Sequence, residues 1–206
     1  MKIKIFLLFF LPALCLCGCY DYSEAETLSI ISCAAVDYNG YQVELFVFAS
    51  DFADSNENDN EKISMSSVGE NMETAVKNME NEYGTHLYWS HCDAIVIGKE
   101  LAEIGIYPVL DFILNTPDAR ITTNLLVAKK AREALEAKDD FGKSIIKVIN
   151  FNKKLNSCPS YTVYKKSALK EEYLLPMLFL SDKGAGFEIH RCAKFLSDRF
   201  QEVSRY

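Results

Sequence analysis

The sequence predicts an α/β (α+β) fold, a single main domain in which a mixed β-sheet is flanked by helices. Three observations support this prediction. Two strand-like segments come early in the chain and are joined by Asn39-Gly40, a strong hairpin signal. Further along, segments with strand and helix patterns alternate, as they do when helices pack on a sheet. The 206 residues are 49% hydrophobic and 25% charged, which suffices for a buried core, and no internal repeat or second apolar span is present.

The predicted hairpin has strands over residues 26–37 and 41–49. In the second strand Val43, Leu45 and Val47 alternate with more polar positions, the pattern of a half-buried strand. Residues 50–62 contain five acidic residues and one basic residue, so they predict an acidic, solvated loop. A calcium loop is the alternative, but the spacing does not follow the EF-hand pattern and the turn glycine is absent.

Helix and strand signals then alternate along the chain. Ser67 followed by Glu70 resembles a capping box and predicts a helix that continues to about residue 82 and is stopped by Gly84. Helices are also expected over residues 99–103, 106–115 with Pro108 in the first turn, 129–137, 140–153 and 166–172. Strands are expected over residues 88–98, 120–128, 174–180 and 188–196, with a turn at residues 182–184.

The N-terminus predicts a lipoprotein signal peptide over residues 1–18. Two lysines precede an uncharged apolar run at residues 5–16, which is too short to span a bilayer. The run ends in LCGC at residues 16–19, which resembles the bacterial lipobox. Cys19 is therefore the predicted acylation site, while Cys15 and Cys17 would leave with the signal peptide. The alternatives are an ordinary cleaved signal and a buried cysteine cluster.

The net charge narrows the possible binding partners, and the cysteine spacing bears on disulfides. The formal charge of −7 argues against binding to nucleic acid and against binding to anionic lipid through a polybasic segment. Membrane contact would therefore depend on the acyl chains. The remaining cysteines show no Cys-x-x-Cys spacing, and three disulfide pairings among them remain open; they are Cys33, Cys92, Cys158 and Cys192. Cys33 and Cys92 lie in apolar runs and are expected to be buried thiols.

No catalytic motif stands out, and neither a cofactor nor a metal is expected. A zinc set can be drawn from the following residues: His86, His91, Cys92, His190 and Cys192. In the predicted strand, however, His91 and Cys92 would point to opposite faces, so a hydrogen-bonded structural His91 is preferred. Asp111 and Arg120 are expected to form an ion pair that fixes the loop between a helix and a strand. No Gly-x-Ser-x-Gly turn or glycine-rich phosphate loop is present.

Residues 88–128 resemble the Ger(x)C family, the lipoprotein subunit of bacterial spore germinant receptors. The matching positions are His91, Ile97-Gly98, Leu101-Ala102, Gly105, Leu110-Asp111-Phe112, Pro117, Arg120 and Leu126-Val127-Ala128. Upstream, residues 18–37 are similar to the family's start, with Tyr20 in place of a Trp and Ala35-Val36 in place of Gly-Ile before the matching Asp37. Residues 64–79 and 189–200 also resemble family segments. Asn115-Thr116 stands where the family has Arg-Asp.

The resemblance implies a non-enzymatic, lipid-anchored subunit of a nutrient receptor in spore germination. Such a subunit would lie on the outer face of the cytoplasmic (inner spore) membrane together with other membrane subunits of the receptor. Residues 19–206 would form the N-terminal domain, with residues 160–206 as the start of a truncated second region, since the family continues into a large C-terminal domain. The alternative is an unrelated lipid-anchored binding protein or a zinc-dependent hydrolase.

Overall fold

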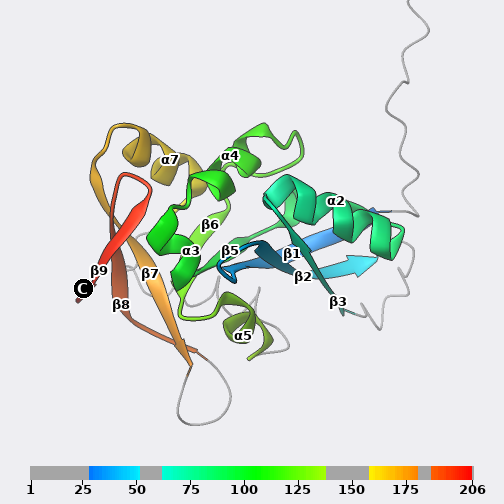
Figure 1. Ribbon diagram of the computed structural model, residues 1–206, viewed down its shortest axis with the longest axis horizontal. Helices are drawn as coiled ribbons and strands as arrows, with labels where there is room; N and C mark the ends of the chain where they lie inside the picture. Colours follow the sequence, from blue (N-terminus) through cyan, green and yellow to red (C-terminus); the bar gives the residue numbers. More distant parts are fainter. Residues whose placement is uncertain (1–27, 52–61, 138–157, 181–186, 206) are drawn as a thin grey trace, which may run out of the picture.

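A computed structural model of the protein describes residues 28–51, 62–137, 158–180 and 187–205 (Figure 1). These residues form one nine-stranded sheet in the order β3-β2-β1-β5-β6-β7-β8-β9, with β4 paired to β1. The elements are β1 (Leu28–Tyr38), β2 (Val43–Asp51), β3 (Lys62–Gly69), α2 (Met72–Tyr83), β4 (His86–Tyr88), the 3₁₀ turn η2 (Trp89–His91), β5 (Ala94–Gly98), α3 (Lys99–Ile104), α4 (Tyr107–Asn115), β6 (Asn124–Ala128), α5 (Ala131–Glu136), α7 (Ser160–Ala168), β7 (Glu172–Leu180), β8 (Phe187–Leu196) and β9 (Arg199–Arg205). The predicted fold class, a mixed sheet flanked by helices, is confirmed.

The centre of the sheet is parallel and its two sides are antiparallel. Strands β1, β5, β6 and β7 run in the same direction, whereas β2–β3 and β8–β9 extend the sheet as antiparallel meanders. Every residue of β5 is buried, because helices cover both faces of the sheet there. The continuous apolar run that predicted this strand follows from that double coverage.

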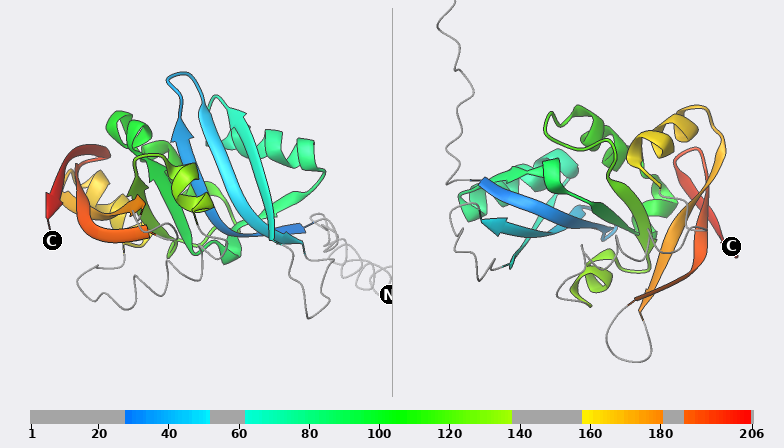
Figure 2. Two further views of the ribbon diagram at one scale, coloured as in Figure 1. Left: turned by 90° about the horizontal axis from the view of Figure 1, so that it is seen from below. Right: turned by 180° about the vertical axis from the view of Figure 1, so that it is seen from behind.

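The two faces of the sheet have separate apolar cores. Helices α2, α3, α4 and α7 contribute to the larger core, while α5 packs on the opposite face with a smaller group of buried residues. Figure 1 shows α2, α4 and α7 on one side of the sheet and α5 on the other, and the views in Figure 2 agree.

Helix α2 covers the outer edge of β3. The Ser66 amide donates to the Tyr83 hydroxyl at 3.4 Å, and the Asn78 side chain donates to the Val68 carbonyl at 2.8 Å. A Cβ atom on Gly69 would overlap the backbone at Ala75, so only glycine allows this close approach of strand and helix. One amide and one carbonyl on the outer edge of β3 are thereby satisfied within the domain.

Local signals identified many elements correctly. The predicted hairpin is present, with Gly40 at a φ of 93°, and Gly84 ends α2 in the left-handed conformation at a φ of 65°. The helices predicted at residues 99–103 and 106–115 correspond to α3 and α4, and Pro108 lies in the first turn of α4.

Other predictions were wrong or incomplete. The capping box is not formed, because Ser67 belongs to β3 and donates to the Ala75 carbonyl at 2.6 Å; Asn71 caps α2 by accepting from the Thr74 amide at 2.8 Å. Strands β3 and β9 were not predicted, and the helix expected at residues 166–172 lies at 160–168 instead. The loop core at residues 52–61, the helix at 140–153 and the turn at 182–184 lie outside the described residues.

Asp37 joins the carboxyl end of β1 to the start of α5. Its side chain is buried, and its two carboxylate oxygens accept the Ala131 and Arg132 amides, each at 2.9 Å. These amides have no acceptor within the helix, so the carboxylate satisfies two otherwise free donors. Gly98, at the end of the neighbouring β5, makes room for it, because a Cβ there would overlap the Asp37 carboxylate.

We expect Gly98→Ala to lower the free energy of unfolding by roughly 1–3 kcal/mol, because the added methyl overlaps the Asp37 carboxylate. Asp37→Ala should lower it by roughly 2–4 kcal/mol, because two charged hydrogen bonds are lost. In the double variant the added methyl can occupy the space that the carboxylate leaves. The combined loss should therefore be clearly smaller than the sum when urea unfolding is measured. A strictly additive loss would contradict the close packing of these two residues.

Candidate functional site

The predicted acylation site, Cys19, lies outside the described residues, so its modification stays a prediction. The described chain starts nine positions later, at Leu28, which lines a groove on the surface. Within the described ranges, none of the helices is both long and apolar enough to cross a membrane. The groove is therefore the described surface feature that is closest along the chain to the predicted anchor.

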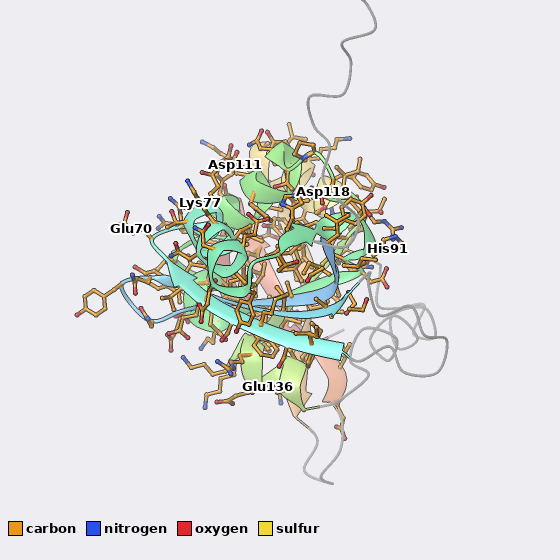
Figure 3. All side chains as sticks on the ribbon, turned by 90° about the vertical axis from the view of Figure 1, so that its right-hand side faces the viewer. Glu70, Lys77, His91, Asp111, Asp118 and Glu136 are labelled. Carbon is orange, nitrogen blue, oxygen red and sulfur yellow. The ribbon has the colours of Figure 1, made fainter. Side chains whose placement is uncertain are left out.

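This groove has a volume of about 650 Å³ and lies between α2, the β4–η2 segment and the loop after α4. Figure 3 shows Lys77 on α2 and Asp118 in that loop, on two of the elements that border it. The apolar lining residues are Leu28, Val76, Leu87, Trp89 and Phe112. The charged or titratable ones are Glu73, Lys77, Glu80, His86 and Asp118.

The inner end of the groove is fixed by Trp89, the single tryptophan of the chain. Trp89 is 2% exposed, and its ring packs edge-on against Phe112 with 5.1 Å between the ring centroids. Its backbone amide donates to the Asp118 carboxylate at 2.7 Å. The loop after α4 is thereby held against η2 by a contact between residues that are 29 positions apart.

The α2 side of the groove is fixed by Glu80. One carboxylate oxygen accepts the Leu87 amide at 3.0 Å and lies 2.7 Å from His86 Nδ1. A carboxylate that holds a backbone amide in this way serves to position β4 beside α2. Both Glu80 and Asp118 are thus structural partners of backbone groups.

The described side chains of the zinc set drawn from the sequence do not come together, and the His190 side chain lies outside the described residues. His91 belongs to the 3₁₀ turn η2, not to a strand, and Cys92 follows this turn. No three His, Cys, Asp or Glu side chains in the described part of the chain are placed to hold a metal ion. The expectation of a hydrogen-bonded structural His91 is also wrong, because this side chain is exposed and its described contact is a tilted ring contact with Tyr88.

The predicted Asp111–Arg120 ion pair is not formed. Arg120 pairs with Asp93 instead, at 3.5 Å, and about half of each side chain is exposed. Solvent screening makes such a pair worth about 0–1 kcal/mol. The loop between α4 and β6 is instead fastened by the contact of Asp118 with Trp89, which the spacing of charges in the sequence did not reveal.

The four described cysteines are thiols in this structure. Cys33 and Cys92 are buried, as predicted, and burial is the main cause that raises the pKa of Cys92 well above its usual value. Burial likewise raises the pKa of Cys158 to about 12. A raised pKa favours the protonated thiol, which is a weaker nucleophile than the thiolate.

The fold and the groove define a mixed α/β domain with a surface depression that has apolar walls and a charged rim. Residues 21–172 match the family described as Spore germination protein N-terminal domain, and the chain belongs to this family. The family identified from residues 88–128 is thereby confirmed.

Two individual relatives can be compared with the chain. Spore germination protein KC of Bacillus subtilis (strain 168) is 28% identical over 141 residues, which are 64% of this chain and 35% of that protein. The solved structure described as the crystal structure of the GerBC protein is 13% identical, with a TM-score of 0.45, over 84% of this chain and 51% of that chain. The chain therefore spans about a third to a half of the length of these relatives.

We expect Asp118→Ala to lower the free energy of unfolding by about 1–3 kcal/mol, because the buried Trp89 amide loses its acceptor. Release of the loop should also expose the Trp89 ring and shift its fluorescence to longer wavelength. Asp111→Ala is the matched control, since Asp111 lies on α4 and makes no hydrogen bond or ion pair in the described structure. Equal effects of the two substitutions would contradict the role of Asp118.

Proposed function

We propose that this protein is a lipid-anchored, non-enzymatic subunit of a nutrient (germinant) receptor in spore germination. The observation that carries the proposal is the family match over residues 21–172, which begins directly after the lipobox-like sequence at residues 16–19. The name of the Bacillus subtilis relative, Spore germination protein KC, supports the same process. A protein with this role would work by binding its neighbours.

The proposed anchor is a diacylglycerol on Cys19. Each buried methylene contributes about 0.8 kcal/mol, so two or more acyl chains bind a membrane stably. Leu28 lies nine positions after Cys19, and a fully extended chain of that length would span at most roughly 30 Å. The groove would therefore lie near the outer face of the cytoplasmic (inner spore) membrane, where membrane subunits of a receptor would be within reach.

The chemistry of the groove supports binding in preference to catalysis. Glu80 and Asp118 accept backbone amides, and His86 contacts Glu80, so these groups already serve the fold. The remaining charged residues, Glu73 and Lys77, lie exposed on α2 at the rim. Apolar walls with a polar rim are the usual anatomy of a protein-binding surface.

We expect Cys19→Ala to release the protein from membranes and to impair nutrient-triggered germination of the parent spores, because the acylated thiol is lost. Cys17→Ala is the matched control, since residue 17 would leave with the signal peptide. Membrane fractionation and a germination assay of spores carrying each variant provide the readouts. Retention of Cys19→Ala in the membrane, or a normal response of spores that lack the protein to every nutrient, would contradict the proposal.

We expect Lys77→Glu to weaken association with the other receptor subunits by about tenfold or more while leaving the fold intact, because the charge at the rim of the groove is reversed. Co-purification from spore membranes measures the association. Lys129→Glu is the control, because Lys129 is equally exposed but lies at the turn between β6 and α5. If both variants co-purify like the wild type, the groove is not the docking surface.

A further inference from the structure

A second cavity, of about 370 Å³, lies at the other end of β1 from the groove. Tyr38, which ends β1, lines this cavity, whereas Leu28, which begins β1, lines the groove. The cavity is bounded by the β1–β2 hairpin, the start of α2, the α3–α4 junction and the turn between β8 and β9. We propose that it binds a small organic cation, an alkylammonium or alkylguanidinium with a short aliphatic chain.

The walls of the cavity are fixed by backbone contacts. The Ile106 amide donates to the Asp198 carbonyl at 2.8 Å, which joins the α3–α4 junction to the β8–β9 turn. Gly105 between the two helices has a φ of 138°, and a Cβ there would overlap the Asp198 carboxylate. A cavity built on such contacts is preformed, which is typical of small-molecule sites.

The lining is mainly apolar. Val43, Met72, Leu101 and Val109 are buried in the larger core and form part of the wall. Around them, Ile104 and Tyr107 leave about half of their surfaces exposed, at 50% and 47%. This arrangement offers a short alkyl chain contact with exposed apolar side chains.

The charges that face the cavity are all negative. Glu70 and Asp198 are the charged lining residues, and neither forms an ion pair within the described ranges. Lys99, on the neighbouring α3, pairs with Glu103 at 3.4 Å. The negative charge of Asp198 is also felt by Tyr173, where burial first and Asp198 second raise the pKa of the phenol. Glu70 lies at the end of the molecule away from His91 (Figure 3).

These features select a cation that also has an apolar part. A ligand carboxylate would be repelled by Glu70 and Asp198, and a neutral ligand would leave both without a counter-charge. Tyr38 and Tyr107 are among the lining residues, and aromatic faces attract ammonium and guanidinium groups. A bare divalent metal ion fits poorly, since two carboxylates in an apolar wall fall short of the six to eight oxygen ligands that calcium takes.

The location agrees with a general property of open α/β sheets, in which ligands bind outside the carboxyl ends of the parallel strands. Tyr38 lies at this end of β1, and the α3–α4 segment that follows β5 forms the facing wall. The site is independent of the proposed receptor role and of acylation at Cys19. Its test can therefore fail or succeed without reference to membrane attachment.

Ligand-observed NMR on the full-length protein in detergent micelles tests the proposal, with n-butylamine and n-butylguanidine as probes. Both should bind in a saturable manner, more weakly as salt is raised, while n-butanol and n-butyrate should not compete. The double variant Glu70→Gln, Asp198→Asn should weaken binding by about tenfold or more, because the ligand loses its charged partners. Glu103→Gln, which removes an acid that already pairs with Lys99, should bind like the wild type.

Glu70→Gln alone is the control for misfolding of the double variant, since Glu70 is exposed and makes no hydrogen bond within the described structure. This single variant should weaken binding severalfold while its thermal unfolding midpoint stays at the wild-type value. The proposal is overturned if neither cation binds, if n-butanol competes equally well, or if the double variant binds as tightly as the wild type.

Discussion

The arrangement of the domain depends on the buried Asp37 carboxylate. Near the end of β1 it accepts two hydrogen bonds from the first amides of α5, and it fits only because Gly98 on the adjacent β5 has no side chain. One interaction thus fixes the relative position of two central strands and the helix on the smaller core. A buried carboxylate is costly unless it is fully paired, so this position tolerates little variation. Asp37 is also a residue by which the segment 18–37 resembles the family, and its contacts with α5 give this residue a structural role.

The groove and the smaller cavity lie at the two ends of the same strand, β1. At the start of β1 the groove has both charge signs at its rim and lies close along the chain to the predicted anchor, which suits contact with a neighbouring subunit. At the end of β1 the smaller cavity is apolar with two carboxylates, which suits a small cation. Both are bordered by α2 and α4, the groove through Glu73 and Phe112 and the cavity through Met72 and Val109. Neither depression contains a metal-binding group of three side chains within the described residues.

The sequence predicted those features that depend on neighbouring residues. The Asn39-Gly40 turn, the end of α2 at Gly84 and the apolar run of β5 are encoded locally, and all three are present. Predictions from the sequence failed where contacts with a distant element determine the local structure. Ser67 resembles a helix cap but lies in β3, because β3 pairs with β2 and α2 starts later, at the cap Asn71. The acceptor of the Trp89 amide is 29 residues away, so no local pattern could identify Asp118. The Ger(x)C resemblance indicated the family but not the position of either depression.

Amide hydrogen exchange at Ala131 and Arg132 tests the role of Asp37 most directly. The first amides of a helix have no acceptor within the helix and normally exchange fast. If the Asp37 carboxylate binds them, both should exchange as slowly as amides of β5 and β6, and Asp37→Ala should abolish this protection. The first turn of α3 is the internal reference, because its N-cap residue Gly98 provides no side-chain hydrogen bond. Exchange at Ala131 and Arg132 as fast as in that turn would contradict the proposed arrangement.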